Sequence, residues 1–367
     1  MARNSERQCV RLRLGLRSRS GLIPKEEDTC MEDSIMQDAV LGFDLGGTRI
    51  KMGIVERSGR VHGFRSTSTD SAKGRAHLLN VLRQIGQSAP GEAASLGLRL
   101  VGVGIGTAGF VDAQGRVAYA TENLPGWTGT NLKKELEEAT GLPAAALNDV
   151  HAMALGEAWL GLPASRGLRD FVCVTLGTGI GGCLIQNGQI FGGRDGYAGG
   201  FGHQIVMQEG GISCGCGSSG CWESYASVNA LKRLIAERLP SDPAEINRTA
   251  DDPQNVSSPI PLPDPRQLFE AARSGSSLAL AIVDEYASRV AVGLVNLVHT
   301  LNVGDFVIGG AIAAQGDFLL RRIAGEVERQ IMPVYRGEGI TLHPATLGEQ
   351  AGVIGAASAL WRDLPMK

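Results

Sequence analysis

The chain has 367 residues, and 43% of them are hydrophobic, so it can bury a core and is not a wholly disordered protein. With a net charge of -3, the chain as a whole lacks the positive field that drives binding to nucleic acids or anionic membranes. No apolar run approaches the length of about 18 residues that a membrane-spanning helix requires. These properties favour a small soluble partner. The 51 glycines, about twice the usual share, cluster after apolar runs, which is typical of phosphate-binding loops.

Residues 1–37 differ from the rest of the chain. An arginine-rich stretch precedes an acidic stretch at residues 26–33, and neither shows a strand pattern. We interpret this segment as a disordered, solvated tail. Two alternatives stay open: an Arg- and Ser-rich organelle presequence, or an over-long start of which Met31 or Met36 is the true first residue.

From residue 39 onward, apolar strands alternate with amphipathic helices. In the first half we predict strands at 39–44, 50–56, 61–66, 100–107 and 144–147, and helices at 72–87, 129–140 and 151–160. In the second half we predict a strand cluster at 171–191, strands at 305–308 and 339–343, helices at 223–238 and 278–301, two further helices after the late strands, and a loop at 240–265. This alternation predicts an α/β fold.

One pattern occurs twice. Residues 43–48 and 174–179, about 130 positions apart, each form an apolar run that turns on glycines beside a threonine. The unhindered amides of such a turn, with the threonine hydroxyl, can hold phosphate oxygens, although an ordinary hairpin turn is an equal alternative for the first. Residues 177–182 also resemble a dinucleotide fingerprint, but a strand pattern follows them instead of a helix. We therefore predict two similar lobes that hold one nucleoside triphosphate between them.

Two further groups of polar residues indicate chemistry. Asn148 and Asp149 follow a buried strand and precede a helix, where α/β proteins gather their sites, although in isolation a helix N-cap is the simpler interpretation. A closed structural zinc site is predicted by four soft ligands with glycines between them, namely His203, Cys214, Cys216 and Cys221. Glu223 would be fixed by the same loop, or be an exposed acid in the first turn of a helix. The other cysteines are scattered, which fits a reducing cytosol.

Several motifs occur in the order that is seen in one known family. They lie at residues 44–48, 122–127, 148–149, 177–181, 202–203 and 214–223. From residue 39 to about 363 the chain thereby resembles the ROK family (repressors, open reading frames, kinases) of the actin-like sugar kinases. The resemblance implies an actin-like ATPase (ribonuclease H-like) fold with two lobes around a central cleft.

The resemblance also implies roles for individual residues and a domain organisation. Asp149 would be the catalytic base, and the sugar would be bound by Asn123, Asn148, His203 and Glu223. ATP and Mg²⁺ would be bound by Asp44, Gly46, Gly47, Thr48, Lys51, Gly177, Thr178, Gly179, Gly309 and Gly310. We expect a tail at 1–37, a small lobe at 38–147 with residues 350–367 packed back on it, and a large lobe at 148–349 with the zinc loop at 203–223. We also expect a cytoplasmic homodimer or homotetramer.

One residue departs from the family pattern. Family kinases usually carry a sugar-binding glutamate at the position of Gly200. Loss of such a charge-assisted hydrogen bond costs about 1.5–3 kcal/mol, so the identity of the sugar is less well determined than the reaction.

We predict a hexose kinase of the glucokinase type. The alternatives are an N-acetylmannosamine kinase, a fructokinase or a polyphosphate-using glucokinase. From other classes, a sugar-responsive transcriptional regulator and a non-catalytic sugar sensor stay open.

Overall fold

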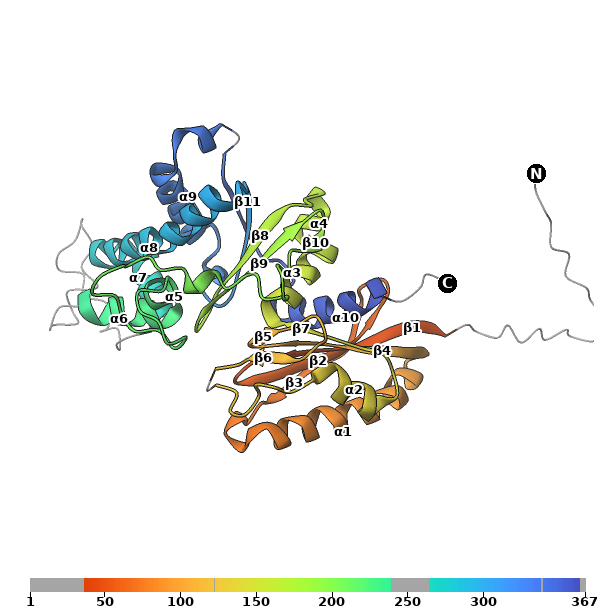
Figure 1. Ribbon diagram of the computed structural model, residues 1–367. Coiled ribbons are helices and arrows are strands. Elements are labelled where there is room, and N and C mark those ends of the chain that lie inside the picture. Colours follow the sequence, from red (N-terminus) through yellow and green to blue (C-terminus); the bar gives the residue numbers. More distant parts are fainter. Residues whose placement is uncertain (1–35, 122, 239–263, 338, 364–367) are drawn as a thin grey trace, which may run out of the picture. The chain divides into compact units, whose positions relative to one another are not determined.

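The computed structural model describes residues 36–121, 123–238, 264–337 and 339–363 (Figure 1). The predicted tail, except its last two residues, and the predicted loop at 240–265, except its end, lie outside these ranges. Strand β1 begins at Gln37 and helix α7 begins at Pro265, so these two residues belong to regular elements and not to the tail or the loop.

The first sheet has the strand order β3-β2-β1-β4-β7. Its strands are β1 (Gln37–Leu45), β2 (Arg49–Glu56), β3 (Val61–Ser68), β4 (Leu98–Thr107) and β7 (Ala144–Asn148). The strands β1, β2 and β3 are antiparallel neighbours, whereas β4 runs parallel to both β1 and β7. Helices α1 (Gly74–Ser95) and α2 (Leu132–Thr140) cover one face, and α3 (Asp149–Leu160) and α10 (Ala351–Asp363) lie against the other (Figure 1).

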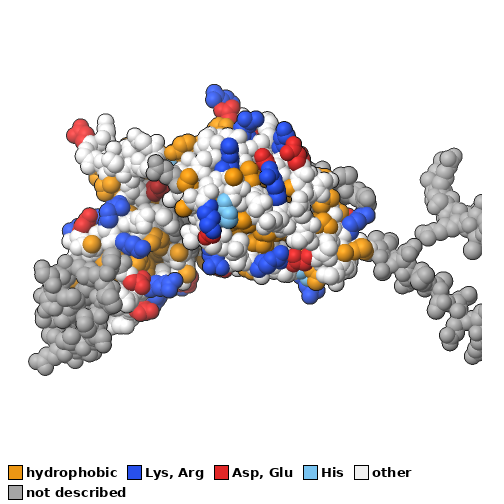
Figure 2. Space-filling view, turned by 90° about the horizontal axis from the view of Figure 1, so that it is seen from below, with side chains coloured by type: hydrophobic (Ala, Val, Ile, Leu, Met, Phe, Trp, Pro, Cys, Tyr) orange, Lys and Arg blue, Asp and Glu red, His pale blue; other side chains and the backbone are white. Residues whose placement is uncertain are grey.

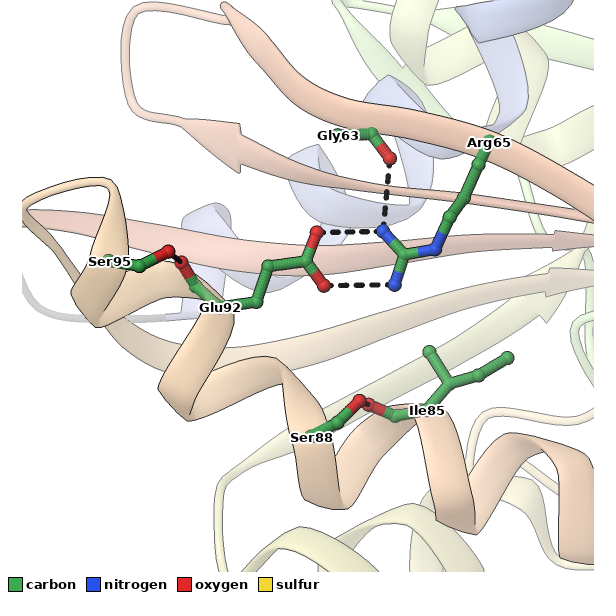
Figure 3. A network of polar contacts seen from close by, with 6 residues as sticks. All are labelled: Gly63, Arg65, Ile85, Ser88, Glu92 and Ser95. Carbon is green, nitrogen blue, oxygen red and sulfur yellow. Dashed lines mark hydrogen bonds and ion pairs between the residues drawn. The ribbon is translucent and has the colours of Figure 1, made fainter.

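Helix α1 is longer than predicted, because it continues through Pro90 to Ser95. Ala89 and Ala93 in this extension are buried. Figure 3 shows a second reason, since Arg65 of β3 donates to both carboxylate oxygens of Glu92 at 2.7 and 2.9 Å. This bidentate pair fastens the end of the helix to the edge of the sheet.

The second sheet repeats this plan, with the order β10-β9-β8-β11-β12. Its strands are β8 (Phe171–Leu176), β9 (Ile180–Gln186), β10 (Gln189–Ile190), β11 (Asp305–Gly309) and β12 (Thr341–Pro344). The first three are antiparallel neighbours, and β11 is parallel to β8 and to β12. Each predicted glycine turn thus closes the first hairpin of its sheet. Because β9 follows the second turn, a Rossmann dinucleotide site is excluded there.

The core of the second sheet is formed with helices α5 (Glu223–Ala226), α6 (Val228–Arg238), α7 (Pro265–Arg273), α8 (Ser277–Leu301) and α9 (Asp317–Gln330). The single helix predicted at 223–238 is wrong, since the extended backbone of Ser227 separates α5 from α6. Helix α2 starts three residues later than predicted, because the side chain of Asn131 accepts a hydrogen bond from the amide of Lys134 and caps it. Helix α4 (Leu162–Arg166) and the hairpin of β5 (Phe110–Val111) and β6 (Val117–Tyr119) are not predicted.

The surface of the described residues carries charges of both signs. Figure 2 shows Lys, Arg, Asp and Glu side chains interspersed on one face. Among the described residues, no helix has the length and apolar character needed to cross a membrane.

Candidate active site

The first glycine turn, between β1 and β2, gathers five of the predicted residues, namely Asp44, Gly46, Gly47, Thr48 and Lys51. Asp44, near the end of β1, lies opposite Lys51, with 3.6 Å between its Oδ2 and the lysine Nζ. The amide of Gly46 donates to the carbonyl of Arg49, which tightens the turn. A Cβ atom on Gly47 would lie 3.4 Å from the Cβ of Asn123, so the segment that carries Asn123 lies against the turn.

The second glycine turn, between β8 and β9, lies beside the pair Gly309 and Gly310, at the end of β11. Gly310 has a φ of +89°, and a Cβ atom there would lie 2.4 Å from the carbonyl oxygen of Leu176, next to the turn. The first amide of α6, that of Val228, donates to the carbonyl of Gly177 at 2.8 Å. Residues 177–179 and 309–310, which are distant in sequence, therefore form one backbone surface.

Asn148 is the N-cap of α3, as its simpler interpretation predicts. Its Oδ1 accepts from the amides of Val150 and His151 at 2.9 and 3.1 Å. Its Nδ2 donates to the carbonyl of Gly109 at 2.8 Å and to Asp149 at 2.9 Å. Both polar atoms of the amide are thus engaged within the protein. One consequence is that Asp149 is held in a fixed orientation.

Asp149 is the first residue of α3 and is half-buried. Burial, and then the nearby charge of Asp44, raise the pKa of Asp149 to about 6, against hydrogen bonds to its Oδ1 that lower it. Among the described residues, its other oxygen accepts no hydrogen bond. Asp149 therefore combines a free oxygen with a pKa close to neutrality, which is what a general base requires.

Asp44 is the second acid of this region. Burial raises its pKa, and the charge and hydrogen bond of Lys51 offset only part of that effect. Of the two carboxylates, Asp44 has Lys51 as a charge partner, whereas no cation among the described residues pairs with Asp149. Carboxylate oxygens of this kind are the ligands that Mg²⁺ prefers, together with phosphate oxygens.

The four predicted zinc ligands converge, with their ligand atoms all within 4.8 Å of one another. The Sγ of Cys214 lies 3.7 Å from the Nδ1 of His203, and the Sγ atoms of Cys216 and Cys221 are 3.6 Å apart. A tetrahedral zinc with a Zn–S bond of about 2.3 Å separates its ligand atoms by about 3.8 Å. The side chains therefore fit a closed zinc site.

Glu223 joins this loop to the second glycine turn. Its Oε2 accepts from the amide of Ile180 at 2.7 Å, and its Oε1 lies 4.0 Å from the Sγ of Cys214. A Cβ atom on Gly179 would lie only 2.3 Å from the same Oε2. Glu223 does stand in the first turn of α5, but it is half-buried and bound to another element, so it is not a merely exposed helix acid.

An aromatic cluster that the sequence does not predict borders Gly200. The ring of Phe110 lies 6.4 Å from that of Tyr119 and 6.2 Å from that of Tyr197. A Cβ atom on Gly200 would lie 3.5 Å from the Phe110 ring. The hydrogen bond from Asn148 to Gly109 places this hairpin next to Asp149. Strands of two and three residues are too short to show a period in the sequence.

The chain is similar to known kinases over most of its length. It is 35% identical over 317 residues to a glucokinase of Halalkalibacterium halodurans, covering 86% of this chain and 92% of the relative. It is 32% identical to a glucokinase of Thermotoga maritima, covering 88% and 96%. The crystal structure of a ROK family glucokinase from Streptomyces griseus, in complex with glucose and AMPPNP, is 32% identical, with a TM-score of 0.70, and the match covers 88% of this chain and 98% of that one.

The sequence pattern of one family spans nearly all of the described body, from residue 40 to residue 363. The fold with two sheets of equivalent topology matches that of the ROK family glucokinase from Streptomyces griseus. The chain belongs to the ROK family.

Proposed function

We propose that this protein is an ATP-dependent hexose kinase that transfers a phosphoryl group to the primary hydroxyl of glucose. The observation that carries the proposal is Asp149, a half-buried carboxylate with one free oxygen and a pKa raised to about 6. It lies close to Asp44, beside the first glycine turn. The similarity to glucokinases at 32–35% identity over most of the chain supports the same reaction.

In this proposal the protein acts mainly by positioning. The amides of residues 47–48 and 178–179 hold the phosphate chain, since those of Gly46 and Gly177 are bonded within their own turns. Gly309 and Gly310 admit the nucleotide to the backbone. Lys51 and Asp44 lie beside the phosphates, and a magnesium ion, when bound by Asp44, would neutralise phosphate charge. Asp149 accepts the proton of the attacking hydroxyl.

The sugar is proposed to lie among Asn123, Asn148, His203 and Glu223. The zinc is proposed to be structural, because four protein atoms fill its coordination positions. It acts through its ligands: His203 binds through Nδ1, which leaves Nε2 for the sugar. The hydrogen bond of Glu223 to Ile180 joins the sugar site to the second glycine turn.

A coupled kinase assay over a panel of hexoses, with ATP and with polyphosphate as donors, tests the proposal. Turnover of glucose with ATP is expected. Gly200 and Phe110 raise an alternative, in which the missing side chain makes room for a substituent on the sugar. Higher activity with a bulkier N-acylated hexose than with glucose would favour this alternative. No turnover with any hexose, together with salt-dependent DNA binding that requires residues 1–37, would favour a regulator. A homodimer or homotetramer is proposed, and light scattering measures it.

A further inference from the structure

A pocket with a volume of about 290 Å³ lies apart from the residues of the proposed kinase site. It is lined by Arg57, Ala158, Trp159, Ser358, Trp361 and Arg362. These residues come from the turn after β2, from the end of α3 and from the end of α10. None of them belongs to the glycine turns, to the sugar residues or to the zinc loop.

Two arginines give this pocket its charge. The Arg57 guanidinium lies over the ring of Trp361, 4.7 Å from its centre. Arg362 donates to the Oε1 of Gln189 at 2.8 Å and to the carbonyl of Gly188 at 3.1 Å, which fixes its guanidinium and leaves further N–H groups available. Among the described residues neither arginine takes part in an ion pair, so their positive charge is not neutralised by a carboxylate.

The remaining polar groups of the lining carry no negative charge. Trp361 is 9% exposed, and its Nε1 is enclosed by protein, without a hydrogen-bond partner among the described residues. The hydroxyl of Ser358, which is 5% exposed, can also donate. No aspartate or glutamate lines the pocket. Partial burial lowers the pKa of the Arg362 guanidinium, as expected for a cation without a partner.

A pocket with two cations that have no carboxylate partner, and with no acid in its lining, has the chemistry of an anion site. Its volume of about 290 Å³ is just below the range of small-molecule sites, about 300–1,000 Å³, so it suits a phosphate or a small phosphorylated compound and not a nucleoside triphosphate. We propose that this pocket binds the phosphoryl group of a small phosphate ester or of free phosphate, separately from the kinase site.

Calorimetric titration of the full-length protein with inorganic phosphate tests the proposal. Saturating glucose and a non-hydrolysable ATP analogue are present, so that the kinase site is filled. We expect binding of about one phosphate per chain, weakened about tenfold or more in Arg57→Gln and in Arg362→Gln. The matched control is Arg60→Gln, an exposed arginine of the same turn that does not line the pocket and should bind phosphate normally.

A second titration with glucose 6-phosphate distinguishes the sources of the phosphoryl group. Tighter binding than that of inorganic phosphate, again lost in Arg57→Gln, supports a phosphate ester, and equal binding supports free phosphate. The proposal is overturned if the saturated wild-type protein binds neither anion. It is also overturned if both arginine variants bind as the wild type does. Arg57 is an exposed turn residue, so its substitution tests binding even where Arg362→Gln fails to fold.

Discussion

Asp149 is the residue at which catalysis and stability make opposite demands. A base needs a pKa close to neutrality, and burial near Asp44 raises the pKa of Asp149 to about 6. The same burial disfavours the ionised form in the folded state. If Asp149 is the base, its replacement by a residue that does not ionise is therefore expected to lower turnover and to raise stability.

Replacing Asp149 with Asn is expected to reduce kcat by about 10²–10⁴-fold while leaving glucose binding intact, because only proton acceptance is removed. In the wild type, kcat/KM should fall as pH drops below about 6, where the free enzyme protonates Asp149. Steady-state kinetics between pH 5 and pH 8 measure both effects, over a range chosen around that pKa. Near-normal turnover of the variant would remove Asp149 from the role of base.

The same variant should unfold at a higher temperature than the wild type above pH 6, with no difference below pH 4. The folded-state pKa of about 6 lies above the ordinary value of 3.8, so the folded protein holds this proton more tightly than the unfolded chain does. Stability is therefore lost as pH rises between these two values, and Asn does not ionise. Thermal melts of the wild type and the variant, below pH 4 and at pH 8, measure this difference in melting temperature. An equal melting temperature at pH 8 would contradict it.

Gly200 determines sugar preference in our proposal. Its φ of -68° is accessible to any residue, and a Cβ atom would be in ordinary contact with Phe110. Gly200→Glu should lower the KM for glucose several-fold or more, since a charge-assisted hydrogen bond contributes about 1.5–3 kcal/mol. Gly200→Gln, of equal size without the charge, should gain less. Unchanged glucose kinetics together with lost activity on a bulkier sugar would show that the pocket was built for that sugar.

At the scale of elements, the zinc loop holds His203 and Glu223 in place. Cys216→Ala is expected to lose a zinc content of about one per chain, and sugar affinity with it. Cys183→Ala is the control, because this buried cysteine lies in β9 outside the cluster and should keep the metal. Metal analysis and glucose titration measure both properties. Full activity in a zinc-free protein would refute a structural role for the metal.

The turn between β8 and β9 is proposed to hold phosphate, and it also contacts Glu223 of the sugar site. Two glycine variants of this turn separate these two roles. Gly179→Ala should raise the KM for the sugar, because its Cβ atom would meet the Glu223 Oε2 at 2.3 Å. Gly177→Ala introduces only a contact at 3.8 Å and should leave the sugar KM unchanged. Steady-state kinetics with varied sugar compare them. Equal sugar KM values in the two variants would argue against this link between the turn and the sugar site.

At the scale of the whole molecule, Glu157 connects elements of both sheets. This fully buried side chain of α3 accepts from the amides of Thr346 and Leu347, both at 2.8 Å, and from the Thr346 hydroxyl at 3.0 Å. These two residues lie between β12 of the second sheet and α10, which packs on the first. The division of the chain into two lobes at residues 147 and 148 stays a prediction.

Glu157→Gln is expected to destabilise the protein by about 1–3 kcal/mol, because an amide nitrogen would face donors and leave buried groups unpaired. Glu328→Gln, at an exposed position of α9, should have little effect. Urea unfolding of both variants measures the free energies of unfolding. Equal midpoints for the two variants would contradict the anchoring role of Glu157.

The sequence by itself determined the features that depend on local pattern. These are the alternation of strands and helices, the repeated glycine turn, the spacing of the zinc ligands and the position of Asp149 between a strand and a helix. Each follows from residues within a few positions of one another, where periodicity and turn chemistry act directly. Element ends were less predictable: burial and a pair with Arg65 extended α1 through Pro90, against the local preference of proline.

Only the tertiary structure decided what meets across the sheets. The hydrogen bond of Glu223 to Ile180, the aromatic ring beside Gly200 and the pocket between Arg57 and Arg362 each join segments that are far apart in the chain. The raised pKa of Asp149 has the same origin, since burial and the charge of Asp44 act through space. Such contacts carry no signal in one sequence, because they arise from the packing of elements whose partners the local pattern does not specify.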